Sequence, residues 1–218
     1  MTEGVSITST DGLTLEAEID AVPEAEASLL LCHPHPKMGG TMNAPLLLAI
    51  RDEMVRRSWN ILRFNFRGIG SSEGHPSTGV EEVADAQGGL GHLRERFQAP
   101  MAIAGWSFGA AVAVRTAAGI DDLLGCVAIA PAVEEKPDIT AGLPPARDLG
   151  ISVPLLVVVG ANDEEVNAEA VRAWAGELDK AIFELVPGAN HFFWARYELV
   201  SNMVGDFLDG RLDGGDGE

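Results

Sequence analysis

The chain of 218 residues is long enough for one domain with a sizeable hydrophobic core. Hydrophobic residues make up 46% of it and charged residues 22%, a composition that is typical of folded globular proteins and excludes a disordered chain. The formal net charge is −18, from 33 acidic and 15 basic residues. Such a surface repels nucleic acid and anionic membranes, so we expect neither as a partner.

Hydropathy and cysteine usage point to a cytoplasmic protein. The first residues lack the apolar stretch of a signal peptide, and no segment reaches the roughly 18 apolar residues that a membrane helix needs. Cys32 and Cys126 both lie in apolar runs, which predicts two buried free thiols and a reducing compartment.

The predicted elements alternate along the chain. The first twenty residues alternate apolar and polar side chains around Asp11-Gly12, which predicts an antiparallel β-hairpin. Short runs rich in Val, Ile and Leu follow, and such runs are typical of parallel strands buried on both faces. We expect strands at 29–32, 61–66, 101–105, 126–130, 154–160 and 181–186. We expect helices at about 45–57, 79–97, directly after Ser107, 164–178 and 194–209.

This alternation predicts one doubly wound α/β domain over residues 1–209, with a mostly parallel sheet. Residues 210–218, with the sequence GRLDGGDGE, are acidic and rich in glycine. We expect them to form a disordered tail.

Two pentapeptides match G-x-S-x-G, the pattern that places a serine on a sharp turn between a strand and a helix. Ser107, in GWSFG, directly follows a predicted strand and precedes an alanine-rich helix. Ser72, in GSSEG, lies several residues beyond its strand and is soon followed by Pro76, which breaks helices. The context favours Ser107 as a nucleophile and Ser72 as a loop residue.

A serine hydroxyl is a weak nucleophile and needs a base, which in turn needs a carboxylate to orient it. In the chain order serine, acid, histidine, His191 is the histidine that follows both other members. Asp163 follows the strand at 154–160 and is the favoured acid, although it could instead cap a helix. Glu134 and Glu135 are the reserve candidates. The carboxyl ends of parallel strands share one sheet edge, so these side chains are expected to meet there.

Several blocks of the chain resemble the α/β-hydrolase superfamily, over about residues 4–209. HPHP at 33–36, GGTMN at 39–43, FNFRGIGSSEG at 64–74 and the GWSFG pentapeptide are most similar to small bacterial hydrolases related to dienelactone hydrolase. Dienelactone hydrolases use a cysteine nucleophile where this chain has Ser107, so the resemblance does not imply lactone specificity. Many members insert a cap where this chain has only residues 131–153, so we expect an open site without a large cap.

The resemblance also places the second oxyanion-hole donor directly after the strand at 29–32. Proline has no N–H, so among residues 33–36 only His33 and His35 can donate from the backbone. We expect the N–H of His33 to join the sheet, and the N–H groups of His35 and Phe108 to bind the oxyanion. His-x-His can ligate zinc, but no further ligands follow at a useful spacing, so neither a metal nor a cofactor is expected.

The chain is therefore interpreted as a carboxylesterase-like serine hydrolase that cleaves small, short-chain esters through an acyl-enzyme. In this interpretation Ser107 attacks, His191 moves the proton and Asp163 orients His191. An apolar wall is expected from Met38, Trp106, Phe192 and Trp194. A thioesterase, peptidase or acyltransferase using the same residues remains an alternative, as does a ligand-binding protein without catalysis. The sequence does not indicate an oligomeric state.

Overall fold

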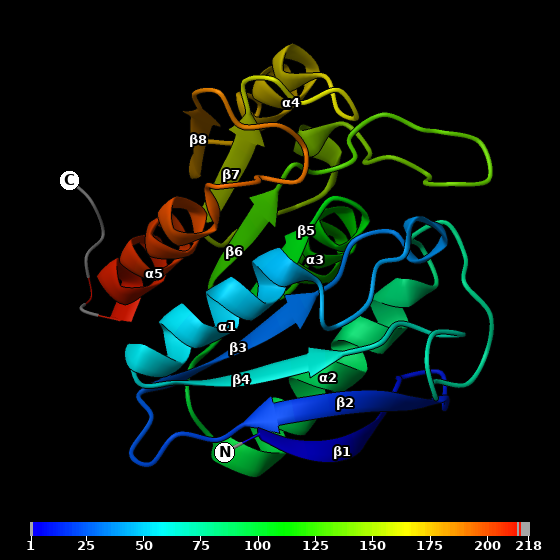
Figure 1. Cartoon of the computed structure of the whole chain (residues 1–218), viewed down its shortest axis with the longest axis vertical. Coiled ribbons are helices and arrows are strands. Elements are labelled where there is room, and N and C mark those ends of the chain that lie inside the picture. The colour runs from blue at the N-terminus through cyan, green and yellow to red at the C-terminus, as the bar shows by residue number, and fades with distance from the viewer. Residues whose placement is uncertain (1, 213, 215–218) are drawn as a thin grey trace.

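The computed structural model describes residues 2–212 and 214, and its centre is one eight-stranded sheet (Figure 1). The strands are β1 (Thr2–Thr8), β2 (Thr14–Asp20), β3 (Ala27–Cys32), β4 (Trp59–Phe64), β5 (Met101–Trp106), β6 (Leu123–Ile129), β7 (Leu155–Gly160) and β8 (Ala181–Val186). They are ordered β1-β2-β4-β3-β5-β6-β7-β8. In this spatial order, each strand from β4 to β8 is parallel to its neighbours in that range. Strand β1 is antiparallel to β2, and β2 is antiparallel to β4.

Five α-helices flank the sheet: α1 (Pro45–Arg56), α2 (Glu82–Phe97), α3 (Phe108–Ala117), α4 (Ala168–Ala175) and α5 (Tyr197–Leu212). Helices α1 and α5 pack together on one face, whereas α2 and α3 lie on the other (Figure 1). Residues of β3, β4, β5 and β7 are buried throughout because both faces of these central strands are covered. The predicted mostly parallel, doubly wound α/β fold with an N-terminal hairpin is confirmed.

Two predicted elements differ from the structure at the β7–β8 end of the sheet. Helix α4 begins at Ala168, because the side chain of Asn167 caps it by accepting from the N–H groups of Glu169 and Ala170. Glu164 and Glu165, which were expected in its first turn, therefore lie in the preceding loop. Strand β8 is not buried on both faces, because it is the edge strand and has an outer side open to solvent.

The boundary of the expected tail also differs. Helix α5 continues to Leu212, so residues 210–212 are helical rather than disordered. Gly214 lies in a turn, and residues 213 and 215–218 of the expected tail lie outside the described residues. In the part of the chain that the structure describes, no helix is both long enough and apolar enough to cross a membrane.

The segment 131–153 links β6 to β7 at the carboxyl end of the sheet. It contains an isolated bridge between Lys136 and Thr140 and the short 3₁₀ helix Ala146–Asp148, which together are too small to form a cap. The residues at or directly after the carboxyl ends of β3, β5 and β6 line a cleft, to which this segment also contributes.

Candidate active site

Ser107 occupies a sharp turn between β5 and α3. Its backbone has φ 58° and ψ −116°, a conformation that L-residues rarely adopt and that marks stored strain. The turn brings strand and helix so close that a Cβ on Gly105 would lie 2.1 Å from the carbonyl oxygen of Gly109. A Cβ on Gly109 would lie 2.3 Å from the carbonyl oxygen of Cys32. Both glycines of the pentapeptide are thus required by close backbone approach.

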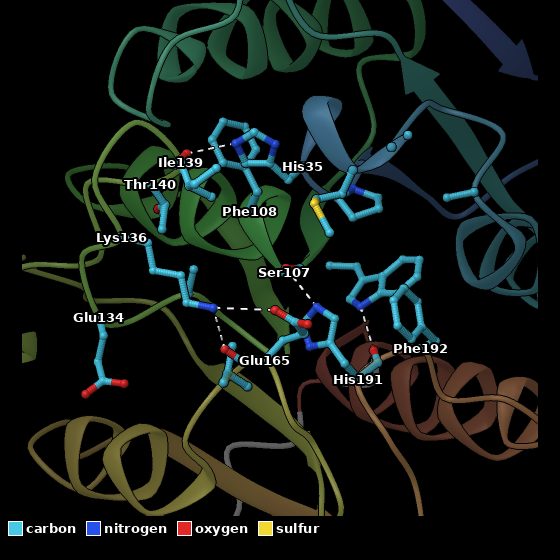
Figure 2. A pocket seen from close by; sticks show the side chains of 18 of the residues that line it. His35, Ser107, Phe108, Glu134, Lys136, Ile139, Thr140, Glu165, His191 and Phe192 are labelled. Carbon is cyan, nitrogen blue, oxygen red and sulfur yellow. Dashed lines mark hydrogen bonds and ion pairs between the residues drawn. The ribbon is translucent and has the colours of Figure 1, made fainter.

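The structure brings Ser107, His191 and Asp163 into one hydrogen-bonded chain, of which Figure 2 shows the contact between Ser107 and His191. The Nε2 atom of His191 lies 3.0 Å from the Oγ atom of Ser107. On the other side of the ring, Nδ1 lies 2.9 and 3.1 Å from the two carboxylate oxygens of Asp163. An acceptor at Nδ1 favours the tautomer in which Nε2 is free to accept a proton from the serine.

Asp163 is oriented by its own backbone surroundings. Its Oδ1 atom accepts hydrogen bonds from the N–H groups of Glu165 at 2.8 Å and Val166 at 2.9 Å. Its side chain is 0% exposed, and that of His191 is 9% exposed. Asp163 thus accepts from backbone N–H groups of the turn that precedes α4, whereas the cap of α4 itself is Asn167.

The backbone of the loop after β8, which carries His191, is fixed by a hydrogen bond and by its own sharp turns. The indole N–H of Trp106 donates to the carbonyl oxygen of His191 at 3.1 Å. Phe193 and Ala195 have positive φ angles of 53° and 58°, so this loop turns sharply on both sides of Trp194. These contacts fix the backbone that carries the histidine.

Two further residues, His35 and Phe108, line the same cleft as Ser107 and each carries a backbone N–H. Phe108 is the first residue of α3, where an N–H has no partner within the helix and the helix dipole favours negative charge. His35 lies in the turn after β3. Among the described residues, neither of these two N–H groups has a hydrogen-bond partner. Both are therefore available to an oxygen atom bound in the cleft.

The other histidine of the HPHP block is part of the interior. His33 is 0% exposed, does not line the cleft, and accepts a hydrogen bond at Nε2 from the N–H of Phe66 at 3.0 Å. The last residue pair between β3 and β5 is Cys32 with Gly105, so His33 lies one residue beyond the paired part of β3. Burial lowers the pKa of His33 to about 4, so its ring is neutral near pH 7.

The cleft has a volume of about 350 Å³ and one predominantly apolar wall. Of the four expected wall residues, Met38, Trp106 and Phe192 line it. Trp194 lies outside it, 64% exposed, and stacks on Phe192 with ring centroids 5.2 Å apart. The apolar residues thus extend from the cleft onto its mouth.

The opposite wall of the cleft consists of residues that no sequence motif indicates. Segment 131–153 supplies Val133, Lys136, Ile139 and Thr140, and the loop before α4 supplies Glu165. The Nζ atom of Lys136 donates to the carbonyl oxygen of Glu165 at 2.8 Å and lies 3.5 Å from its carboxylate (Figure 2). These residues have no periodic pattern or motif, so only the fold identifies them.

The remaining candidates lie elsewhere. Ser72 is buried, with its Oγ atom donating to the carbonyl oxygen of Asn65 and accepting from the N–H of Glu16. Glu134 lines the cleft, but its carboxylate points away from His191 (Figure 2). Cys32 and Cys126 are buried and free, and burial raises the pKa of both thiols. No group of three or more potential metal ligands occurs among the described residues.

The sheet, the turn that carries the serine and the Ser–His–Asp chain are those of an α/β-hydrolase with a serine nucleophile. A family model described as serine aminopeptidase, S33, matches residues 23–150. The chain belongs to this family.

Known proteins resemble the chain over most of its length. An uncharacterized protein of Rickettsia prowazekii (strain Madrid E) is 31% identical over 196 residues, which cover 85% of this chain and 79% of that protein. A putative α/β-hydrolase of unknown function from Agrobacterium tumefaciens is 27% identical, with a TM-score of 0.84 and 97% coverage of both chains. An α/β serine hydrolase without a lid from Xanthomonas campestris is 25% identical, with a TM-score of 0.80 and coverage of 95% and 94%.

Proposed function

We propose that this hydrolase is a carboxylesterase-like enzyme that cleaves small, short-chain esters through an acyl-enzyme. The observation that carries the proposal is the chain of hydrogen bonds from Asp163 through His191 to Ser107, at an open cleft. The HPHP and GGTMN blocks further support a place among the relatives of dienelactone hydrolase.

In the proposed mechanism the Oγ atom of Ser107 attacks the ester carbonyl carbon while Nε2 of His191 takes its proton. The carboxylate of Asp163 stabilises the imidazolium that forms. The carbonyl oxygen becomes an oxyanion, which the N–H groups of His35 and Phe108 bind. When the tetrahedral intermediate collapses, the C–O bond to the alcohol breaks and His191 returns the proton to the alcohol. Water then repeats the sequence on the acyl-enzyme and releases the acid.

The dimensions of the cleft support a small substrate. Its volume of about 350 Å³ is at the low end of the range for small-molecule sites. Met38, Trp106 and Phe192 offer apolar contact to an acyl or alcohol chain. In the part of the chain that the structure describes, segment 131–153 is too short to form a large cap, which leaves the mouth of the cleft accessible to dissolved esters.

An aminopeptidase is the second candidate, because the matching family carries that description. Such an enzyme must hold the α-amino group of a peptide, and Glu134 and Glu165 are carboxylates at the cleft. The Glu165 carboxylate lies 3.5 Å from Lys136, which offsets its charge. This favours the esterase over the aminopeptidase.

A direct test compares two substrates and one probe. The wild-type enzyme should hydrolyse p-nitrophenyl butyrate, react with a fluorophosphonate probe at Ser107 and leave alanine p-nitroanilide nearly untouched. Faster turnover of the anilide would favour the aminopeptidase. Failure of wild type to react with the probe would contradict a serine hydrolase of either kind.

A further inference from the structure

His33 does not line the cleft, but its ring contacts the Pro34–His35 peptide unit, whose residues do line it. The Nδ1 atom of His33 is 2.7 Å from the carbonyl oxygen of Pro34. That carbonyl belongs to the same peptide unit as the N–H of His35, and both Pro34 and His35 line the cleft. The His33 ring is therefore bonded directly to the unit that supplies one of the two proposed oxyanion donors.

The hydrogen bonds fix the tautomer of this ring. A backbone N–H can only donate, so the bond from the Phe66 N–H at 3.0 Å makes Nε2 an acceptor. The single hydrogen of the neutral ring then resides on Nδ1 and is donated to the carbonyl oxygen of Pro34. A ring that is 0% exposed and bonded at both nitrogens has one defined orientation.

The peptide unit is held on more than one side. In a trans peptide the C=O and N–H groups point in opposite directions, so fixing the carbonyl toward His33 aims the N–H of His35 away from it. Gly40 packs against the same unit so closely that a Cβ there would lie 2.0 Å from the Pro34 oxygen. Its N–H also donates to the carbonyl oxygen of His35 at 3.1 Å.

Aromatic contacts join this arrangement to the second proposed donor. The rings of His33 and Phe66 lie 4.6 Å apart, and the rings of Phe66 and Phe108 lie 5.7 Å apart. The ring of His35 meets that of Phe108 at 4.9 Å. The residues that carry the two N–H groups are thus packed into one cluster with His33.

We infer that His33 is a positioning residue for the oxyanion hole, an inference that rests on the proposed function. The Nδ1–H of His33 orients the Pro34–His35 peptide so that the His35 N–H is aimed at the reacting carbonyl. Preorganised donors lower the barrier because they need no reorientation as charge develops. A histidine that only filled the interior would affect folding but not this alignment.

Two substitutions separate the two hydrogen bonds of His33. The side-chain amide of asparagine reaches the position of Nδ1, so His33→Asn can keep the bond to Pro34 while losing the one from Phe66. Glutamine reaches the position of Nε2, so His33→Gln can keep the bond from Phe66 while losing the one to Pro34. Each variant loses one buried hydrogen bond, so their stabilities should fall by similar amounts. His75→Asn, at an exposed loop position, is the control.

The experiment measures kcat and KM for p-nitrophenyl butyrate, inhibition by a trifluoromethyl ketone, and Tm, at a temperature well below every Tm. His33→Gln should lose about 10- to 100-fold in kcat, less than removal of a whole donor costs, with KM nearly unchanged. Its affinity for the ketone, which forms an oxyanion with Ser107, should fall in parallel. His33→Asn should stay within about 3-fold of wild type, because it keeps the bond that matters for preorganisation.

Equal kcat values for the two variants, or losses that simply follow Tm, would overturn the inference. Failure of the proposed function has a different signature, because the wild-type enzyme itself would then neither turn over the ester nor react with the probe. That result would overturn the inference as well. A wild-type enzyme that is active, with Ser107→Ala inactive and His33→Gln unimpaired, would overturn the role of His33 alone.

Discussion

The Nε2 atom of His35 donates to the carbonyl oxygen of Ile139 at 2.8 Å and so ties the turn after β3 to the opposite wall of the cleft. The tautomer is set by the other nitrogen, because Nδ1 accepts from the N–H of Lys37 at 2.9 Å. His35 is 5% exposed, and burial lowers the pKa of its ring. The side chain of His35 thus has its own structural task beside the proposed role of its backbone N–H.

We expect His35→Ala to reduce kcat by roughly 10-fold, because loss of the Ile139 bond loosens the turn that carries the proposed donor. His35→Pro deletes that donor and should cost on the order of 10²–10³-fold in kcat. Steady-state kinetics on p-nitrophenyl butyrate, with circular dichroism to verify folding, distinguishes the two. Lys37→Ala, which removes only an exposed side-chain bond to the carbonyl of Asp138, is the matched control. A folded but inactive His35→Ala enzyme would indicate that the imidazole itself takes part in the chemistry.

Ser107→Ala should lower kcat for ester hydrolysis by about 10⁴-fold or more, because among the described residues Ser107 is the one whose hydroxyl is hydrogen-bonded to His191. Ser72→Ala should leave kcat largely intact but lower the free energy of unfolding by about 1–3 kcal/mol, because it leaves the buried carbonyl of Asn65 and the partly buried N–H of Glu16 without their partner. Kinetics and urea unfolding of both variants test this. An inactive, folded Ser72→Ala enzyme beside an active Ser107→Ala enzyme would reverse the choice of nucleophile.

The geometry around Ser107 could be predicted from the sequence because it depends on where strands end. Ser107, Asp163 and His191 each follow an apolar run, and the carboxyl ends of parallel strands share an edge. The positions of Lys136 and Ile139 could not be predicted, because segment 131–153 has no periodicity to fix its path. The start of α4 was misplaced because Asp163 and Asn167 are both good capping residues, and only the structure decides between them.

We expect His191→Ala to be about as damaging as Ser107→Ala, and the double variant to be little worse, because the residues act as a unit. Asp163→Asn should lower kcat clearly, since an amide can present its N–H to Nδ1 and so favour the wrong tautomer. The carboxylate of Glu134 points away from His191 (Figure 2), so Glu134→Gln is the charge-matched control and its kcat should remain near that of wild type. An active Asp163→Asn together with an inactive Glu134→Gln would move the acid to the end of β6.

Buried His33 should make the protein less stable in acid. Its pKa is about 4 in the folded state and near 6.5 when unfolded, so between these values the unfolded chain binds a proton that the folded chain does not. The contribution is absent above pH 6.5 and grows as the pH falls to 4, where it reaches about 3 kcal/mol of lost stability. Urea unfolding of wild type and His33→Asn across this range isolates the effect, because other titrating groups are common to both. A stability difference that does not change with pH would contradict the buried, neutral ring.

Segment 131–153 is tied to the turn after β3 through His35 and Lys37 and to the loop before α4 through Lys136, so it forms a fixed wall rather than a movable lid. A site without a lid needs no oil–water interface to open it, so acetate and butyrate esters should be hydrolysed at rates that saturate below their solubility limits. Palmitate esters should be poor substrates, because the cleft of about 350 Å³ is small for a sixteen-carbon chain. Initial rates measured across the solubility limit of tributyrin provide the test, with Lys136→Ala as the variant that releases one tie. A jump in the wild-type rate when droplets form, lost in Lys136→Ala, would show that the segment opens as a lid.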